Sequence, residues 1–301
     1  MLSGGFSTEA VNEVKHIPDT RLVAMTKKET NGLSIWRLGD CTTDLIDECE
    51  KIENANHISK SATLDCSSDQ VVFGSRLNDI CLVDTSTNKV TGHSQNFLAD
   101  DCLNKLFLLD DHVLLACCQK NCKVWRLDLR EGLHKGECLY SRETTSTAIT
   151  DQTCSYWTYD IEKSAGCISE SSGVLSLGPG GNVVKVDLRN AKKSAFLVKL
   201  AGMTSCDSHE EECYGMLKTS PTHKDVVSVS GLDHSIHVYS FNNMVDGSVI
   251  QSHFTHDGHM ACSNQSKTVT VTAHIWHPWQ PDLILSSGSD GSLHAWQREG
   301  T

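Results

Sequence analysis

Aromatic residues, prolines and long apolar segments are all scarce in this sequence. Phe, Trp and Tyr make up 6% of the 301 residues, and there are five prolines. No run of about 20 apolar residues occurs, so no segment has the length of a membrane-spanning helix. Long stretches with helical spacing of apolar residues are missing too, which argues against a fold of amphipathic helices. The remaining composition, 39% apolar and 21% charged, is that of an ordinary globular protein.

The chain also lacks an excess of positive charge. It has 26 Lys and Arg against 38 Asp and Glu, a formal net charge of −12. Because no surplus of cations is available to neutralise phosphates, we expect no direct binding to nucleic acid and none to anionic membranes. The acidic tails of tubulin are disfavoured in the same way. The charge favours a partner with a basic protein surface.

A secretion signal is missing from the start of the sequence. Residues 1–5 have neither the basic nor the apolar part of such a signal, so we expect a cytoplasmic protein. The 14 cysteines are then expected to be reduced thiols. Several lie among apolar neighbours, as in 80–83 and 114–118, where a thiol packs like a small apolar side chain.

One short pattern recurs six times. Each copy follows a turn and alternates in polarity up to an aromatic or β-branched anchor. The anchors are Trp36, Val83, Trp125, Val186, Tyr239 and Trp296. They lie 52 residues apart on average, and one four-stranded blade of the WD40 kind takes about 40–45 residues. The sequence therefore predicts an all-β fold, a WD40 β-propeller with six recognisable blades that carry loop insertions.

We expect one propeller domain over residues 1–301, with insertions near 40–57, 127–155, 201–215 and 260–270. A further strand is expected before the first three anchors, at 21–25, 70–74 and 113–118. The runs 40–53 and 204–213 are acidic. They are interpreted as solvated loops, with a docking patch for a basic partner as the alternative. Residues 297–301 are too few for an outer strand after the last anchor, so an N-terminal segment is expected to close the ring.

The last copy is the most complete and closely resembles a WD40 repeat. It contains Gly258-His259, the stretch 273–276, and 283–296 with Asp290-Gly291 before Trp296. In that family a His, a Ser or Thr, an Asp and a Trp form a buried hydrogen-bonded chain, and the resemblance assigns these structural roles to His259, Ser286, Asp290 and Trp296. Because residues 260–270 separate His259 from the next strand, His274 is an alternative, and an incomplete chain is another.

Catalytic and metal sites are not expected. His253, His256, His259 and Cys262 recur every third residue and raise the question of zinc. However, a strand places only every second residue on one face, and no pair of cysteines lies nearby, so a histidine-rich loop is the better interpretation. The glycine-rich turn 178–182 lacks the Lys and the helix of a phosphate-binding loop. No known catalytic motif occurs, and we expect no enzyme, cofactor or metal.

Asp187 and Arg189 resemble the Asp-x-Arg box of WD40 substrate receptors of cullin-4 ubiquitin ligases. The tryptophan that precedes this box in the family is absent, because Val186 stands in its place. Asp128 and Arg130 repeat the spacing two residues out of register. An arginine that pairs with a neighbouring aspartate is the simpler interpretation, and a ligase adaptor is the alternative partner.

Several stretches resemble one branch of the WD40-repeat family. They are 4–7, 15–22, 254–259, 272–278 and 293–296. The resemblance implies a non-enzymatic adaptor for cytoplasmic assembly of the Integrator RNA endonuclease module, with the endonuclease subunits as partners in a hetero-complex that this chain joins as a monomer. It implies, as the alternative, a regulator of microtubule organisation at spindle poles. Members of that branch carry a further blade at the N-terminus, so seven blades are expected in the full-length form and the first is expected to be missing here.

Overall fold

A computed structural model describes residues 7, 9–39, 46–53, 61–98, 100–142, 156–162, 173–190, 194–202, 215–231, 234–242, 244–259 and 269–298. Over these residues the regular structure consists of β-strands and short 3-10 turns. The chain divides into two compact units, Met1–Ser141 and Arg142–Thr301. Within the described ranges, no helix is long and apolar enough to cross a membrane.

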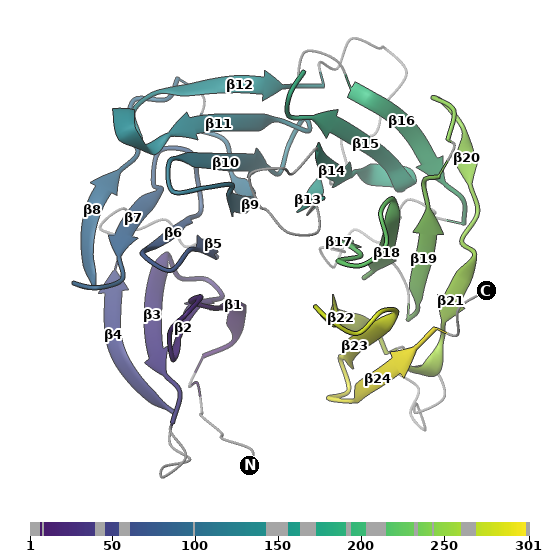
Figure 1. Ribbon diagram of the computed structural model, residues 1–301, viewed down its shortest axis with the longest axis horizontal. Coiled ribbons are helices and arrows are strands. Elements are labelled where there is room, and N and C mark those ends of the chain that lie inside the picture. The colour runs from purple at the N-terminus through teal and green to yellow at the C-terminus, as the bar shows by residue number, and fades with distance from the viewer. Residues whose placement is uncertain are drawn as a thin grey trace. The chain divides into compact units, whose positions relative to one another are not determined.

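The first unit contains three antiparallel sheets of four strands, in which neighbours in sequence are neighbours in space (Figure 1). The strands of the three sheets are β1 (Val11–His16), β2 (Leu22–Lys27), β3 (Gly32–Arg37) and β4 (Asp47–Glu53); β5 (Thr63–Cys66), β6 (Gln70–Gly74), β7 (Cys81–Asp84) and β8 (Lys89–His93); and β9 (Leu103–Leu108), β10 (Val113–Cys118), β11 (Val124–Asp128) and β12 (Gly136–Tyr140). The first strands of successive sheets, β1, β5 and β9, lie against one another.

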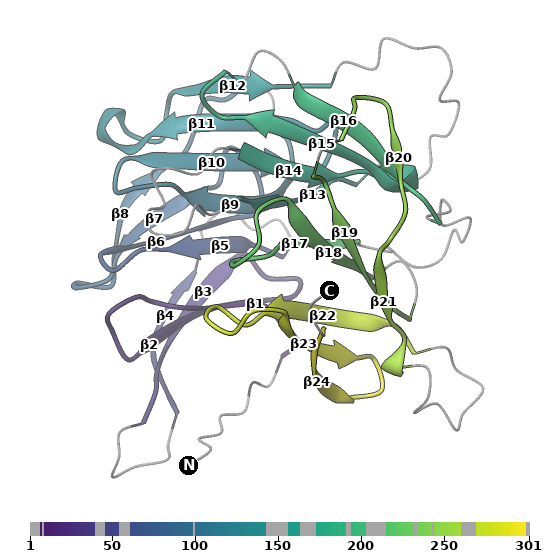
Figure 2. The same ribbon diagram turned by 45° about the vertical axis from the view of Figure 1, so that its right-hand side comes forward.

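The second unit also contains three sheets (Figure 2). Their strands are β13 (Thr158–Ile161), β14 (Gly173–Leu177), β15 (Asn182–Asp187), β16 (Ser194–Leu200) and the short β20 (Val249–Ile250); β17 (Met216–Thr219), β18 (Val226–Ser230), β19 (Ile236–Ser240) and β21 (Phe254–His256); and β22 (Val271–Trp276), β23 (Leu283–Gly288) and β24 (Leu293–Gln297). β20 pairs in parallel with β16 of the preceding sheet, so the segment between β19 and β21 joins two sheets. Among the described residues, the last sheet has three strands.

These six sheets are propeller blades, so the prediction of an all-β WD40-type β-propeller with six blades is confirmed. All six anchors lie on the third strand of their sheets: β3, β7, β11, β15, β19 and β24. The strands expected before the first three anchors coincide with β2, β6 and β10 within two residues. One domain over the whole chain stays a prediction, because each compact unit is described by itself.

Strand position within a blade explains the sequence patterns. The second strands β14 and β18 are buried along their whole length and are made of apolar and small residues, as expected of strands packed on both faces. The outer strand β4 is the opposite, because every residue except Ile52 is exposed. A strand that buries so little has no need of an alternating pattern.

This is why two expected insertions are partly wrong. The range 40–57 contains β4, and the range 127–155 contains a 3-10 turn at Leu129–Glu131 and the outer strand β12. β4 is polar and almost wholly exposed, and the first three residues of β12 are exposed, so these sequences look like loops. Most of the other two expected insertions, at 201–215 and 260–270, lies outside the described residues, as does the acidic run 204–213.

A β-bulge accompanies the anchor in four blades. The pairing of the third with the fourth strand shifts register immediately before Trp36, Val83, Trp125 and Val186. A bulge bends its strand and increases the local twist, which suits a strand that must curve around the outside of a blade. The recurrence of the anchor in the sequence thus coincides with a recurrent backbone feature.

Ion pairs join the innermost strands of the first unit. Glu13 on β1 pairs with Lys105 on β9 at 2.6 Å, and Lys15 pairs with Asp65 on β5 at 2.5 Å. Glu13 also accepts hydrogen bonds from the hydroxyl and backbone of residues on β5. Burial alone would raise the pKa of Glu13, but the charges of Lys105 and Lys15 outweigh it, and the pKa falls to about 2. These contacts hold three blades together where their strands converge.

Candidate functional site

A chain of polar side chains runs through the last sheet. The indole Nε1 of Trp296 donates to Ser286 Oγ at 3.3 Å, and His259 Nε2 shares a hydrogen bond with the same hydroxyl at 2.9 Å. The other nitrogen of His259, Nδ1, lies 3.0 Å from Ser292 Oγ. Because His259 and Ser286 are buried, each needs these partners to satisfy its polar atoms.

Asp290 joins this chain through Ser292. Its Oδ1 accepts from the backbone N–H of Ser292 at 3.0 Å, and the hydrogen bonds from Ser292 lower the pKa of the carboxyl. The structure therefore brings together the four residues of the expected tetrad, with Ser292 between Asp290 and His259. Ser292 was not predicted from the sequence. Its position two residues after Asp290 in the turn could have indicated it, because an aspartate in a turn commonly accepts the N–H of the residue two places on.

His274, the alternative to His259, has a different position. It is buried on β22 and shares hydrogen bonds with Ser228 Oγ at 2.8 Å and Ser230 Oγ at 2.7 Å, both on β18 of the preceding sheet. Burial, reinforced by the charge of Lys218, lowers the pKa of His274 to about 3. His259 thus braces its own blade, whereas His274 connects two blades.

Replacing Ser286 by alanine should lower the free energy of unfolding by about 2 kcal/mol. The reason is that Trp296 Nε1 and His259 Nε2 lose the hydroxyl to which both are hydrogen-bonded. Urea denaturation of the purified chain measures this change. The matched control is Ser287→Ala on the more exposed side of the same strand, where the hydroxyl contacts Thr272, with an expected cost below about 0.5 kcal/mol. Equal effects of the two substitutions would contradict a structural role for the chain of polar contacts.

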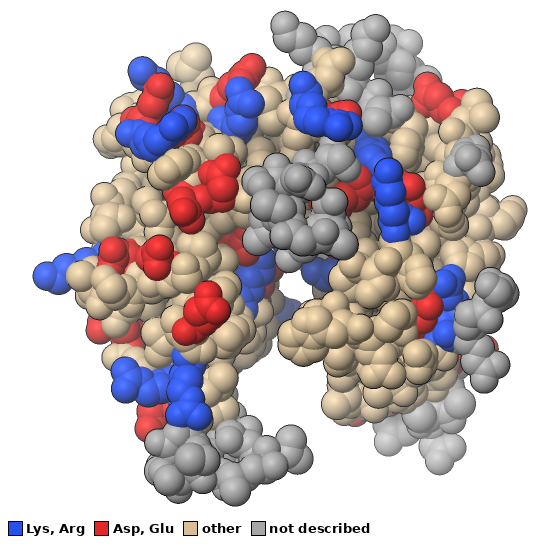
Figure 3. Space-filling view, in the orientation of Figure 1, with Lys and Arg blue, Asp and Glu red and all other residues tan. Residues whose placement is uncertain are grey.

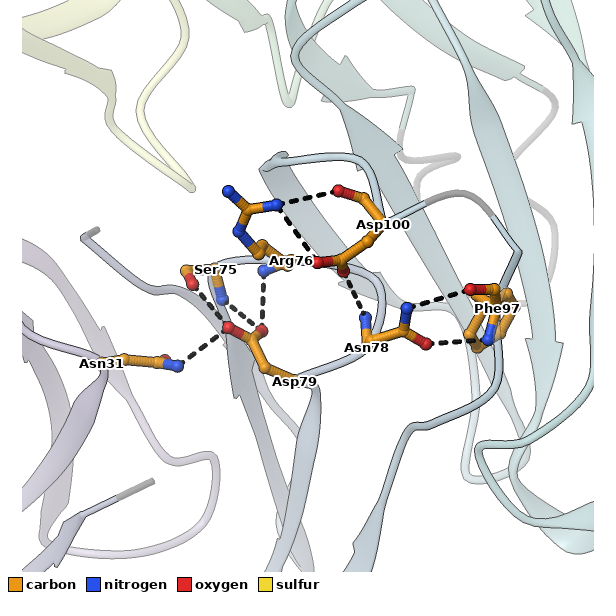
Figure 4. A network of polar contacts seen from close by, with 7 residues as sticks. All are labelled: Asn31, Ser75, Arg76, Asn78, Asp79, Phe97 and Asp100. Carbon is orange, nitrogen blue, oxygen red and sulfur yellow. Dashed lines mark hydrogen bonds and ion pairs between the residues drawn. The ribbon is translucent and has the colours of Figure 1, made fainter. Parts of the chain in front are cut away.

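A second buried polar cluster lies in the turn between β6 and β7 (Figure 4). The carboxylate of Asp79 accepts hydrogen bonds from the backbone N–H groups of Ser75 and Arg76, at 2.8 and 2.7 Å, and from the Ser75 hydroxyl. It also accepts from Asn31 Nδ2 at 2.9 Å, across from the neighbouring blade. Asp79 is only 4% exposed, so its charge depends on donors within the protein rather than on water.

The same turn holds the loop between β8 and β9. Asn78 donates to the carbonyl of Phe97 and accepts from its N–H, while Arg76 Nη1 reaches both the carbonyl and the carboxylate of Asp100, each at 3.1 Å (Figure 4). Between these clamped positions Leu98 is fully exposed. A loop fixed on both sides that presents an apolar side chain loses little conformational freedom when a partner binds.

We call the residues of this turn and loop the Asp79 surface, in which Asp79 and Ser75 are themselves buried beneath the exposed residues. They are Asn31, Ser75, Arg76, Asn78, Asp79, Phe97, Leu98 and Asp100. It is the best-organised candidate for protein contact in the described part of the first unit. Sequence reasoning missed it, although Asp79 directly precedes the second recurrent strand, where a WD40 turn carries its aspartate.

The other anchors are held mainly by packing, although the Tyr239 hydroxyl also donates to the carbonyl of Ala201 at 3.5 Å. Val83, Val186 and Tyr239 are buried. The indole N–H groups of Trp36 and Trp125 are buried and have no hydrogen-bond partner among the described residues. Trp125 instead packs edge-on against Phe97 with ring centroids 5.7 Å apart. Among the described residues, the indoles of Trp36 and Trp125 thus differ from that of Trp296, which donates to the hydroxyl of Ser286.

Asp187 and Arg189 form an ion pair with each other. Arg189 Nε and Nη2 donate to the two carboxylate oxygens of Asp187, at 3.1 and 3.0 Å. Asp128 and Arg130 form the same fork, at 3.0 and 2.6 Å. Two turns of different blades therefore use one local arrangement, in which the aspartate also accepts the backbone N–H of the arginine. This geometry explains the motif without a ligase.

Cys81 and Cys117 are buried thiols. Burial raises the pKa of Cys81 to about 12 and that of Cys117 well above its ordinary value. Because the thiolate is the reactive form, these two thiols are inert packing groups at neutral pH.

On the face seen in Figure 3, charges of both signs are interspersed over the first unit, while the surface over β22–β24 carries few of them.

Comparison with known proteins adds a resemblance over nearly the whole chain. No family model matches the sequence. The chain is 29% identical to a Danio rerio protein named "Integrator complex assembly factor WDR73", over 97% of this chain and 76% of that protein. Proteins of the same name from Xenopus laevis and Homo sapiens are 28% and 25% identical, over 97% of this chain and 77% of each of them. The resemblance that the terminal stretches predicted is confirmed.

Proposed function

We propose that this chain is a non-enzymatic assembly scaffold that binds the RNA endonuclease subunits of Integrator in the cytoplasm. The observation that carries the proposal is the similarity, along 97% of the chain, to relatives that are named Integrator complex assembly factors. A similarity of this extent covers all six blades rather than one repeat, so it includes the loops that give a propeller its binding specificity.

The chemistry of the described residues supports a scaffold. Their buried polar groups are engaged in holding turns and blades together, as at Asp79, His259 and His274. The net charge of −12 favours a basic partner surface such as the RNA channel of a nuclease, which would be covered during assembly. Within the described ranges, nothing specifically favours the microtubule alternative, and the Arg189 fork leaves the cullin-4 alternative without support.

The test is affinity purification of the tagged chain from a cytosolic extract, followed by mass spectrometry. We expect the endonuclease subunits to be enriched over a mock purification. Recovery of other proteins without these subunits would refute the proposal.

A substitution locates the contact. Leu98→Asp should reduce recovery of the endonuclease subunits at least about fivefold, because an apolar anchor becomes a desolvated charge. The matched control is Val245→Asp, at an exposed valine of the second unit, which should change recovery less than about twofold. Unchanged recovery with Leu98→Asp would move the contact away from the Asp79 surface and leave the scaffold function standing.

A further inference from the structure

Three imidazole rings converge in the second unit. His256 ends β21, His259 follows three residues later, and His294 lies on β24. One ring nitrogen of each lies within 4.8 Å of the others. β21 belongs to one sheet and β24 to the next, and the end of β21 lies beside the last sheet in both ribbon views (Figures 1 and 2).

Two of the nitrogens are spaced as metal ligands require. His294 Nδ1 and His256 Nε2 are 3.5 Å apart. In a tetrahedral zinc site with Zn–N bonds of about 2.0–2.1 Å, two ligand nitrogens lie about 3.3–3.4 Å apart. The observed pair therefore matches two corners of such a site. For His259 to supply a third, its ring must turn out of its parallel stack on His294 and exchange one of its hydrogen bonds to Ser286 or Ser292 for the metal.

A glycine keeps the space beside these nitrogens open. A Cβ built on Gly258 would lie 2.8 Å from His256 Nε2 and 3.1 Å from His294 Nδ1. The backbone at Gly258 is not in the left-handed region, so the need for glycine here is one of space. Any other residue would place its Cβ against both ligand atoms.

Aromatic rings flank the cluster. The ring of His256 stacks on Trp296 with centroids 4.4 Å apart, and His259 stacks on His294 with centroids 4.0 Å apart. The carboxylates of Asp257 and Asp290 are near enough to act electrostatically on His256 and His259, respectively. Stacked rings limit the orientations of the imidazoles, and nearby carboxylates favour a bound cation electrostatically.

We propose that His256, His259 and His294 bind one divalent transition-metal ion, with Zn²⁺ as the reference ion and water in the remaining position. The ion would cross-link β21 of one blade to β24 of the next. Among the residues that first suggested zinc, His253 instead contacts Arg298, and Cys262 lies outside the described residues. The third ligand comes from a strand 35 residues further along the chain than His259.

The test is titration of the purified 301-residue chain with Zn²⁺ by calorimetry and with Co²⁺ by visible absorption. We expect one equivalent of either ion to bind. His256→Gln and His294→Asn should each weaken binding at least tenfold, and Gly258→Ala should do the same without removing a ligand. His253→Gln, a neighbouring histidine outside the cluster, is the matched control and should bind within twofold of the unmodified chain.

Two further readouts separate metal binding from folding. Zn²⁺ should raise the melting temperature of the unmodified chain and leave that of His294→Asn unchanged, while near-UV circular dichroism without metal should be the same for both. If His294→Asn does not fold, ring resonances of three histidines in the unmodified chain should still shift together on Zn²⁺ addition. Substoichiometric binding, equal affinity in the two histidine variants, or an unaffected Gly258→Ala chain would each overturn the site.

Discussion

Replacing Asp79 by alanine is expected to lower the free energy of unfolding by about 3–5 kcal/mol. The carboxylate serves four donors, and two of them are backbone N–H groups at Ser75 and Arg76 that the alanine leaves without an acceptor. Hydrogen bonds to a charged acceptor contribute more than neutral ones, and an unmade bond in a buried turn costs the full desolvation of the donor. The substitution also removes the contact of Asn31 between two blades.

Urea denaturation of the Asp79→Ala chain measures this loss. Asp79→Asn should be more stable than Asp79→Ala, because its amide oxygen can still accept a hydrogen bond from the backbone. It should remain less stable than the unmodified chain, because its NH2 group faces other hydrogen-bond donors. The matched control is Asp100→Asn, at a more exposed carboxylate of the same surface, with an expected cost below about 1 kcal/mol. A cost of Asp79→Ala as small as that of Asp100→Asn would show that the turn does not depend on the buried carboxylate.

Acid is expected to destabilise the second unit through His274, by about 3 kcal/mol between pH 7 and pH 4. The pKa of this histidine is about 3 in the folded chain, against an ordinary value of 6.5. Well above pH 6.5 the ring is neutral in both states, and the contribution of His274 to stability is fully present. As the pH falls below 6.5, the unfolded chain takes up a proton that the folded chain does not bind, so stability declines until about pH 3.

Stability measured by urea denaturation at a series of pH values tests this linkage. His274→Gln keeps hydrogen-bonding atoms near Ser228 and Ser230 but cannot titrate, so its stability should fall less steeply between pH 6.5 and pH 4. Burial also lowers the pKa of His253, His256 and His259, which leaves a shallower slope in the variant. Parallel pH profiles of the two chains would show that His274 does not control the acid response.

Much of the fold could be predicted from short-range patterns. The third strands are bounded by turns and alternate in polarity, as in β7, where Cys81 and Val83 are buried and the two residues that alternate with them are only partly buried. This local pattern was sufficient to find the anchors of all six blades. It failed for β4 and β12, because an exposed outer strand buries too little to impose any period on its residues.

The sites show the same division. His259 and Ser286 could be assigned from a motif whose members keep a characteristic order in one repeat. Asp79 was missed because its blade has a valine at the anchor and no companion histidine in the motif. The cluster around His256 could not be found from the sequence, because His294 joins it from another sheet, 38 residues away in sequence.

The amino-acid sequence by itself determined the strand periods, the blade anchors and the acidic charge, because each depends on a residue and its near neighbours. The tertiary structure alone decided which polar groups meet across blades. Asn31 reaches Asp79 over 48 residues, and His274 reaches Ser228 over 46. Such contacts depend on how one sheet stacks on the next, and the stacking is set by the summed burial of both faces. No local pattern of residues encodes that sum.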